Sequence, residues 1–185
     1  MKKTLFIAIA ACIITVANAE TVSELQSEIK GLKTAKKQEE ITLRKLDRTE
    51  VSYQSKQNFK TDFEGITNVS WTKEDYYDVA DFTWHGKDTR AYYDNDGNLV
   101  GTIAPASFTD LPLASQEKIK RDYKGYNVEH VIFYDDNESN STNMILYGTQ
   151  FEDADNYFVE LGKGTKEIVL QVSTEGDIYY FATIL

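Results

Sequence analysis

The sequence predicts an α+β fold of two tandem repeats, each a helix followed by an antiparallel sheet, preceded by a charged helical arm. Two observations predict it. After residue 51, helical spacing of apolar residues gives way twice to segments in which apolar and polar residues alternate, as half-buried strands do. Residues 62–65, DFEG, also match residues 122–125, DYKG. We therefore expect repeats at about 51–110 and 111–185.

Residues 1–19 have the three parts of a secretory signal peptide. Two lysines precede an apolar run at 5–16, which is too short to span a bilayer as a helix, and residues 17–19, ANA, form a cleavage site. We predict export, to the periplasm or outside the cell, with 20–185 as the mature chain. No transmembrane segment is expected in it.

The single cysteine leaves a second route to the envelope open. Residues 9–12, IAAC, resemble a lipobox that would leave a lipidated Cys12, but the apolar run before it is short and apolar residues follow it. With residues 1–19 removed, the mature chain has no cysteine. An exported protein without disulfides depends on its core for stability.

The mature chain is strongly acidic. The full sequence has 20 basic and 30 acidic residues, and the signal peptide removes two lysines and no acid, which leaves 18 − 30 = −12. This charge repels nucleic acid and anionic lipid and suits a basic partner or a cation. A solvated surface explains the same charge, so we exclude only nucleic acid as a partner.

Residues 20–50 predict a charged helical arm. Val22, Leu25, Ile29 and Leu32 recur at helical spacing, but the stripe ends well before the three or four heptads of a coiled coil. The arm is either an oligomerisation or docking device, or a spacer after the signal peptide.

The first repeat is expected to hold one helix and four antiparallel strands. The helix covers 51–65, and its terminal glycine is a common helix stop. A hairpin turn is indicated at 95–97, NDG. The expected strands are 66–71, 76–84, 89–93 and 98–104.

The second repeat carries an acidic insert at about 135–155. Matching residues are offset by 60 at Gly65 and Gly125 and by 79 at Gly97 and Gly176, so about twenty residues have been added. The expected elements are a helix at 115–123 and strands at 126–134, 144–148, 165–172 and 177–184. In the last strand Ile178, Tyr180, Ala182 and Ile184 alternate and are expected to share one face.

The residues that carry catalysis in known motifs are scarce. The mature chain has no cysteine nucleophile, and His85 and His130 lie far apart in sequence. We find no G-x-S-x-G, no H-E-x-x-H and no glycine-rich phosphate loop. We therefore predict no enzyme, no catalytic residue and no cofactor, although a triad assembled across the fold stays open.

Two acidic stretches are candidates for cation binding. The NDG turn fails as an EF-hand, because Tyr92 and Ile103 would occupy its first and twelfth ligand positions. The insert has acids without a defined ligand spacing, so we predict no metal site. A divalent-cation-responsive envelope protein remains the alternative function, through Asp135, Asp136, Glu138, Glu152, Asp153 and Asp155.

Aromatic residues on the predicted strands are the more specific signal. In a strand, neighbouring rings point to opposite faces, so half of each tyrosine pair can face outward. Tyrosine and tryptophan are common anchors of protein interfaces. Helices or the arm covering these rings would give a purely structural role instead. The candidate partner-binding residues are Trp71, Tyr77, Trp84, Tyr92, Tyr93 and Tyr179.

These patterns together resemble a family of exported domains from Bacteroidetes. The motifs are F-x-x-x-F at 59–63, NVSW at 68–71, AYYDNDG at 91–97, LP at 111–112 and YKGY at 123–126. Over about residues 53–185 the chain is similar to PepSY-like proteins, which are related in fold to the β-lactamase-inhibitor protein. The resemblance implies a PepSY-like domain at 51–185, with tandem helix-plus-sheet units and neither catalysis nor a cofactor.

The expected function is therefore an exported, non-enzymatic binding protein. Its partner would be a protein or peptide of the cell envelope, and inhibition of an enzyme such as a peptidase is suggested by fold similarity alone.

Overall fold

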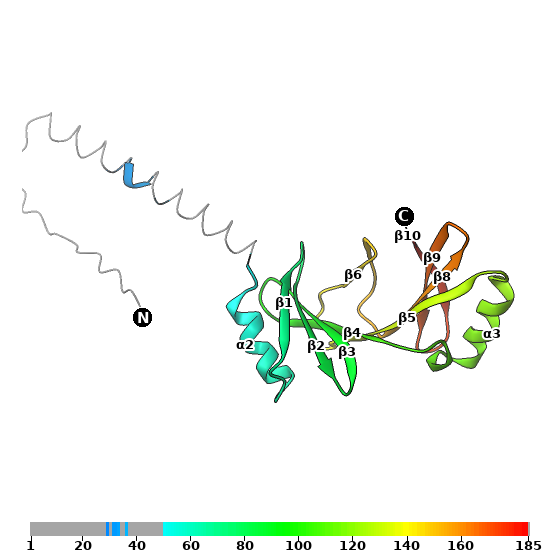
Figure 1. Cartoon of the computed structure of the whole chain (residues 1–185). Helices are drawn as coiled ribbons and strands as arrows, with labels where there is room; N and C mark the ends of the chain where they lie inside the picture. The colour runs from blue at the N-terminus through cyan, green and yellow to red at the C-terminus, as the bar shows by residue number, and fades with distance from the viewer. Residues whose placement is uncertain (1–28, 30, 34–35, 37–49, 185) are drawn as a thin grey trace, which may run out of the picture. The chain divides into compact units, whose positions relative to one another are not determined.

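The computed structural model describes residues 29, 31–33, 36 and 50–184 (Figure 1). The predicted signal peptide, Cys12 and most of the arm lie outside these residues; the described arm residues 29, 31–33 and 36 are helical, whereas Glu50 is in a bend. Residues 1–46 and 47–185 form separate units, of which the second carries the fold. Within the described part of the chain, no helix is long and apolar enough to cross a bilayer.

Residues 50–184 fold into one antiparallel sheet with two α-helices, a short 3₁₀ helix and a small hairpin, which confirms the predicted α+β class. The helices are α2 (Tyr53–Asp62), the short 3₁₀ helix η1 (Phe108–Asp110) and α3 (Leu113–Asp122). In spatial order the sheet strands are β1 (Val69–Lys73), β2 (Asp78–Trp84), β3 (Lys87–Tyr93), β4 (Leu99–Pro105), β5 (Asn127–Asp136), β8 (Asn156–Lys163), β9 (Lys166–Ser173) and β10 (Ile178–Ile184). The separate hairpin is β6 (Ile145–Leu146) with β7 (Thr149–Gln150).

The sheet runs without a break through both predicted repeats. We expected a sheet for each repeat, but β4 pairs with β5 from Gly101–Asp136 to Pro105–Ile132, which joins all eight strands. The division into two tandem repeats stays a prediction. The NDG turn is confirmed as a hairpin turn, in which Asp94 Oδ1 accepts hydrogen bonds from the Asp96 and Asn98 N–H groups at 2.9 Å.

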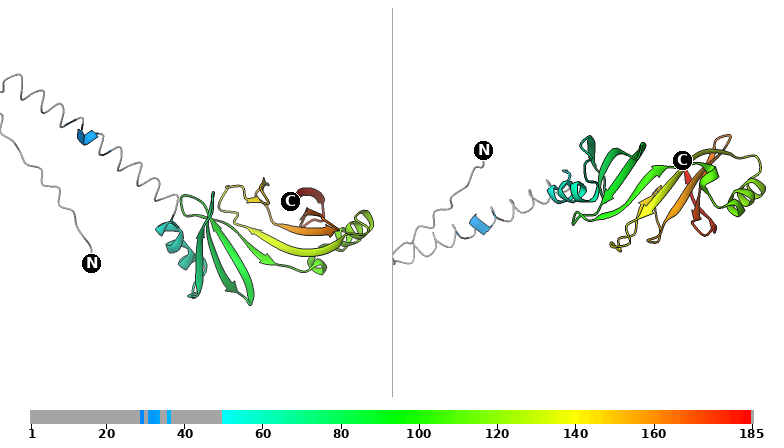
Figure 2. Two further views of the ribbon diagram at one scale, coloured as in Figure 1. Left: turned by 45° about the horizontal axis from the view of Figure 1, so that its top comes forward. Right: turned by 90° about the horizontal axis from the view of Figure 1, so that it is seen from below.

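Both helices lie against the same face of the sheet, near its two ends (Figures 1 and 2). The register shows this. Ala91 packs under α2 and pairs with Thr102 on β4. Ala104, two residues after Thr102 and therefore on the same face, pairs with Phe133 on β5. The Phe133 ring lies 4.8 Å from the ring of Tyr157, which packs with the residues under α3. We call this side the helix face. Its α2 cluster is Phe59, Phe63, Ala80, Phe82, Ala91 and Tyr93, and its α3 cluster is Leu111, Ile119, Val131, Val159, Leu161, Ile168, Leu170 and Val172.

The opposite side of the sheet is covered by the insert. Because β5 continues to Asp136, the insert spans residues 137–155, two residues shorter at its start than predicted. Met144 and Phe151 from the insert are buried against sheet residues, and we call this side the insert face. The buried sheet residues here are Tyr77, Val79, Tyr92, Val100, Ile103, Tyr134, Phe158, Val169 and Ala182.

The last strand corrects one prediction. The register of β10 against β9 shifts between Tyr180 and Ala182, which leaves Phe181 as a bulge. A bulge adds one residue and reverses the alternation beyond it. Ile178 therefore packs with the α3 cluster, whereas Ala182 and Ile184 lie on the insert face.

A buried carboxylate holds the start of α2 to the sheet. Asp78 Oδ2 accepts hydrogen bonds from the Ser55 hydroxyl at 2.6 Å and the Ser52 N–H at 2.9 Å. Lys73 Nζ lies 2.8 Å from Asp78 Oδ1. Ser52 also caps α2, because its hydroxyl accepts the Ser55 N–H at 3.0 Å. This network joins the helix entry to β1 and β2.

Candidate functional site

The structure places the six predicted partner-binding residues in three separate regions. Tyr77 and Tyr92 form an edge-to-face pair on the insert face, with ring centroids 5.7 Å apart. Trp71, Trp84 and Tyr93 lie on the helix face with the α2 cluster. Tyr179 lies on β10, an edge strand, and is 59% exposed. They do not form one site.

For Tyr77, Tyr92 and Tyr93 the alternative of covered rings applies, and none of the three offers an exposed surface to a partner. These rings are 5%, 3% and 0% exposed, because α2 covers one face of the sheet and the insert covers the other. The Tyr93 hydroxyl donates a hydrogen bond to Asp62 Oδ2 at 2.9 Å. The Tyr77 hydroxyl donates to the Asn143 carbonyl at 3.2 Å, which ties the insert to the sheet.

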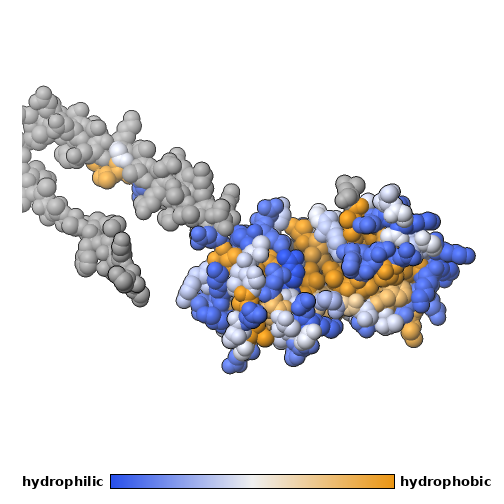
Figure 3. Space-filling view, in the orientation of Figure 1, coloured by the Kyte–Doolittle hydropathy of each residue, from blue (hydrophilic) through white to orange (hydrophobic). Residues whose placement is uncertain are grey.

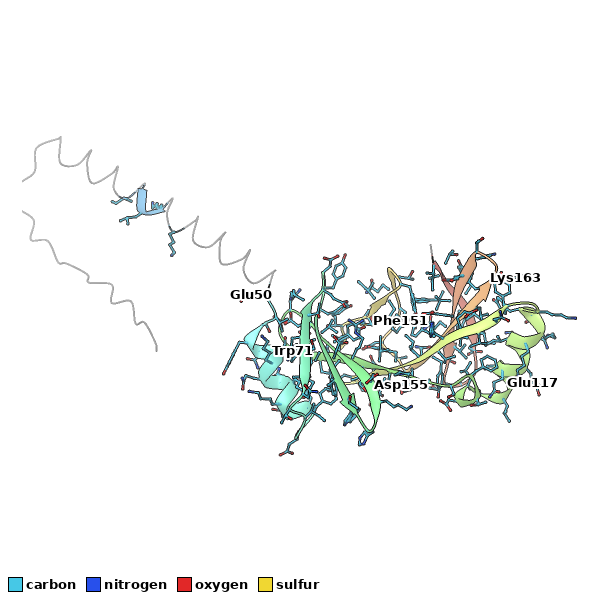
Figure 4. The ribbon with its side chains drawn as sticks, in the orientation of Figure 1. Glu50, Trp71, Glu117, Phe151, Asp155 and Lys163 are labelled. Carbon is cyan, nitrogen blue, oxygen red and sulfur yellow. The ribbon has the colours of Figure 1, made fainter. Side chains whose placement is uncertain are left out.

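Trp71 and Trp84 are half-buried structural residues of the α2 cluster. Trp71 packs edge-on against Phe59 at 5.5 Å, and Trp84 packs edge-on against Phe63 at 5.2 Å. Figure 4 shows Trp71 beside α2 and Phe151 over the middle of the sheet. Aromatic pairs of this geometry stabilise a core beyond their buried area.

A groove on the insert face is the strongest candidate site. It consists of two open hollows of about 510 Å³ each, one on either side of Arg90, which lines both. In Figure 3, apolar surface (orange) is exposed over the middle of the molecule, in the region of β6. The polar, aromatic and apolar residues that line the groove include Glu74, Asp75, Tyr76, Asp81, Asp88, Arg90, Ile145, Leu146 and Tyr147.

Arg90 is held rigidly at the centre of this groove. Its Nη2 lies 2.7 Å from Glu74 Oε1, its Nε lies 2.9 Å from Asp81 Oδ1, and its guanidinium carbon lies 5.4 Å above the Tyr92 ring. Burial raises the pKa of the Tyr92 phenol to about 12, so the ring stays neutral beneath the guanidinium. The floor of the groove is thus fixed before any partner arrives.

The rim of the groove offers exposed aromatic and apolar side chains. Tyr76 is 59% and Tyr147 is 36% exposed, with the half-buried Ile145 and Leu146 between them along the lining. The Tyr147 hydroxyl donates a hydrogen bond to Glu160 Oε1 at 2.6 Å, which orients its ring. Tyr76, Tyr147 and Arg90 were absent from the predicted residues.

The groove is also acidic. Among the described residues that line it, four are carboxylates and Arg90 is the single cation. Two of these acids pair with Arg90, which leaves Asp75 and Asp88 for a partner. A positively charged surface is therefore the complementary one.

The acids at the base of the insert do not converge on a cation site. Asp155 Oδ1 accepts the Asp136 N–H at 2.8 Å, and Asp136 Oδ1 accepts the Tyr134 hydroxyl at 2.9 Å. Burial and the neighbouring Asp153 raise the pKa of Asp136 to about 6. Within residues 50–184, no three histidine, cysteine or acidic side chains are arranged to hold a metal ion.

The two histidines occupy different settings. His85 lies in the turn between β2 and β3 with a left-handed backbone (φ 49°), and its ring is 4.7 Å from Trp84. His130 is exposed on β5.

Known structures share this fold. A DUF2874 family protein from Bacteroides uniformis is 18% identical, with a TM-score of 0.58 over 71% of this chain and 88% of its own. A BLIP-like protein from Bacteroides fragilis is 20% identical, with a TM-score of 0.56 over 73% and 87%. A protein from Bacteroides eggerthii assigned to the periplasm is 16% identical, with a TM-score of 0.59 over 73% and 90%.

No family model and no curated protein sequence matches the chain. At these identities the structural likeness shows the fold and nothing finer. Membership of the PepSY-like family stays a prediction, and the chain has the fold of BLIP-like proteins.

Proposed function

We propose that this chain is an exported, non-enzymatic binding protein that holds a protein or peptide of the cell envelope in the groove on its insert face. The single observation that carries the proposal is the fixed Arg90, set between two hollows and bordered by the exposed Tyr76 and Tyr147. Structural neighbours described as BLIP-like and periplasmic support the same class of function.

The residue types suit an interface. Tyrosine and arginine are enriched among residues that dominate binding energy, and tyrosine has few rotatable bonds to immobilise. Arg90 already makes two ion pairs, so little entropy is lost when a partner covers it. Uncompensated Asp75 and Asp88 favour a partner with a basic surface, such as a basic face of an envelope peptidase.

Affinity capture with matched variants tests this proposal. We would immobilise residues 20–185 and a Tyr76→Ala/Tyr147→Ala variant, and identify proteins retained from envelope and secreted fractions. Tyr53→Ala is the control, because Tyr53 is 75% exposed on α2 and does not line the groove. A Tyr179→Ala variant tests the remaining exposed residue of the original prediction.

The expected result is a protein that the native chain and the Tyr53→Ala variant retain and the double variant loses. Retention that survives the double variant, or that is lost only with Tyr179→Ala, would place binding elsewhere on the molecule. The cation-responsive alternative has no geometric support among the described residues, and a melting temperature that rises with added calcium would revive it.

A further inference from the structure

One end of this acidic molecule is basic. All six lysines and arginines of residues 111–184 lie on α3, on the turn after it, or at the turn between β8 and β9. Arg121 pairs with Asp122 at 2.7 Å, and three further acids are exposed near these cations: Glu117, Glu167 and Glu129, which lies beside Gly162. Figure 4 shows Lys163 at the end of the sheet next to α3, which carries Glu117. The six residues are Lys118, Lys120, Arg121, Lys124, Lys163 and Lys166.

Three of these cations border an apolar hollow of about 420 Å³: Lys120 and Lys124 line it, and Lys163 lies over Tyr126, another lining residue. Lys120 Nζ lies 5.4 Å above the Phe108 ring, and Lys163 Nζ lies 5.5 Å above the Tyr126 ring. A side-chain carbon at Gly125 would lie 3.5 Å from Lys163 Nζ, so this ammonium sits over the turn after α3. The hollow is lined by Phe108, Ile119, Lys120, Tyr123, Lys124, Gly125, Tyr126, Val128 and Leu161.

The α2 end of the same sheet shows what closes such a hollow. Trp84 pairs with Lys87 at the end of one hairpin, in the position that Lys163 takes opposite Lys166 in the other. The Trp84 ring packs against Phe63, the C-cap residue directly after α2, with ring centroids 5.2 Å apart. At the α3 end the tryptophan is replaced by a lysine, so the space beside Tyr123 is left open.

The residues two positions earlier on the same two strands also differ in size between the two ends of the sheet. Phe82 pairs with Val69 on the α2 side, whereas Leu161 pairs with Val128 on the α3 side, and Val128 is 41% exposed. The stabilisation of helix ends by cations accounts for basic residues in the last turn of α3. It does not account for Lys163 and Lys166, which come from a hairpin.

We propose that this hollow binds a small amphiphilic anion, in which a carboxylate or phosphate head group is attached to an apolar tail. The head group lies between Lys124 and Lys163, and the tail packs on Ile119, Val128 and Leu161. The volume falls within the range of small-molecule pockets, and apolar walls with a few placed charges are their usual composition.

Titration of residues 20–185 with decanoate and with decyl phosphate, followed by NMR of the backbone amides, tests the site. Decyltrimethylammonium and acetate are the ligand controls, because one lacks the anion and the other lacks the tail. The expected result is saturable binding of at least one decyl anion, with shifts confined to α3, the turn after it and the β8–β9 turn. Neither control saturates these signals.

Two variants connect the binding to the cations and to the hollow. Lys124→Gln/Lys163→Gln is expected to raise Kd at least tenfold, whereas Lys87→Gln, at the corresponding turn between β2 and β3, leaves it unchanged. Lys163→Trp copies the arrangement at Trp84 and is expected to abolish binding by filling the hollow. Folding of each variant is checked by circular dichroism and melting temperature.

Three results would overturn the proposal. They are the absence of saturable binding by both decyl anions, equal binding of the ammonium compound, and an unchanged Kd in a folded Lys124→Gln/Lys163→Gln variant. The double glutamine variant changes only exposed side chains, so it keeps the proposal testable even if Lys163→Trp does not fold.

Discussion

Replacing Asp78 by alanine tests the reasoning about the buried network at the start of α2. The side chain is fully buried, and its Oδ2 accepts hydrogen bonds from Ser55 at 2.6 Å and Ser52 at 2.9 Å, while its Oδ1 forms an ion pair with Lys73 Nζ at 2.8 Å. The variant leaves the Lys73 ammonium, which is only 13% exposed, without its counter-ion, and leaves two donors unpaired.

The expected loss of stability follows from these contacts. Removing one partner of a buried ion pair costs about 3–5 kcal/mol, and we expect about 3 kcal/mol because Lys73 keeps some access to water. For a domain of this size that loss lowers the melting temperature by roughly 6–12 °C.

Urea unfolding followed by tryptophan fluorescence measures this loss, since Trp71 and Trp84 both contact the α2 cluster. Asp81→Asn is the matched control. Its carboxylate also pairs with a cation but is 43% exposed, so we expect a loss below about 1 kcal/mol. Adding Lys73→Met to Asp78→Ala should recover part of the stability by removing the unpaired charge. An Asp78→Ala loss no larger than that of Asp81→Asn would show that the buried network contributes little stability, and a double variant less stable than the single one would show that the unpaired Lys73 charge is not the cause of the loss.

Two carboxylates and one glycine give further predictions. Burial opposes ionisation of Asp78, but the contacts with Lys73, Ser55 and Ser52 outweigh it and lower the pKa of Asp78. The ionised carboxylate therefore stabilises the folded state above about pH 4, and this stabilisation is lost as the pH falls further. The pKa of Asp136 is raised to about 6, so its stabilisation is present below about pH 4 and is lost as the pH rises through 6. Asp136→Asn should remove that decline, about 1 kcal/mol after discounting for partial exposure, in urea unfolding at pH 4.5 and 7.5; an unchanged pH slope contradicts it. Gly97→Ala should cost about 2 kcal/mol in the same assay, because φ is +80° and the new carbon would lie 2.8–2.9 Å from Gln54 and Ser55, whereas Gly86→Ala, with open space around it, should cost less.

Local patterns predicted most of the elements. The expected helices and sheet strands each overlap an observed one, because alternation and helical spacing reflect burial on one side of an element. The NDG turn formed as predicted. Its stabilising hydrogen bonds are local, because the Asp94 carboxylate accepts the N–H groups of Asp96 and Asn98, which lie two and four residues further along the chain. The bulge at Phe181 was not predictable from alternation, because β10 continues to alternate in sequence beyond the residue that reverses its faces.

The candidate groove depended on contacts that alternation does not encode. Arg90 meets Asp81 directly across β2–β3 and Glu74 just beyond β1, so its two ion pairs require the register of three strands. Alternation correctly separates Tyr92 from Tyr93 onto opposite faces. It does not reveal that both faces are covered at these positions, so the burial of both rings could not be predicted from it.

The sequence alone indicated the two helices, most of the strands, the export signal, the excess of acids and the NDG turn, but the expected strands did not include β8. These properties follow from residue spacing and local hydrogen bonding. Only tertiary packing established that β4 and β5 join all strands into one sheet, that the insert packs on one face of it, and that Lys163 lies over the Tyr126 ring beyond α3. Burial and charge depend on which distant segments pack together, and that choice is made by the whole chain.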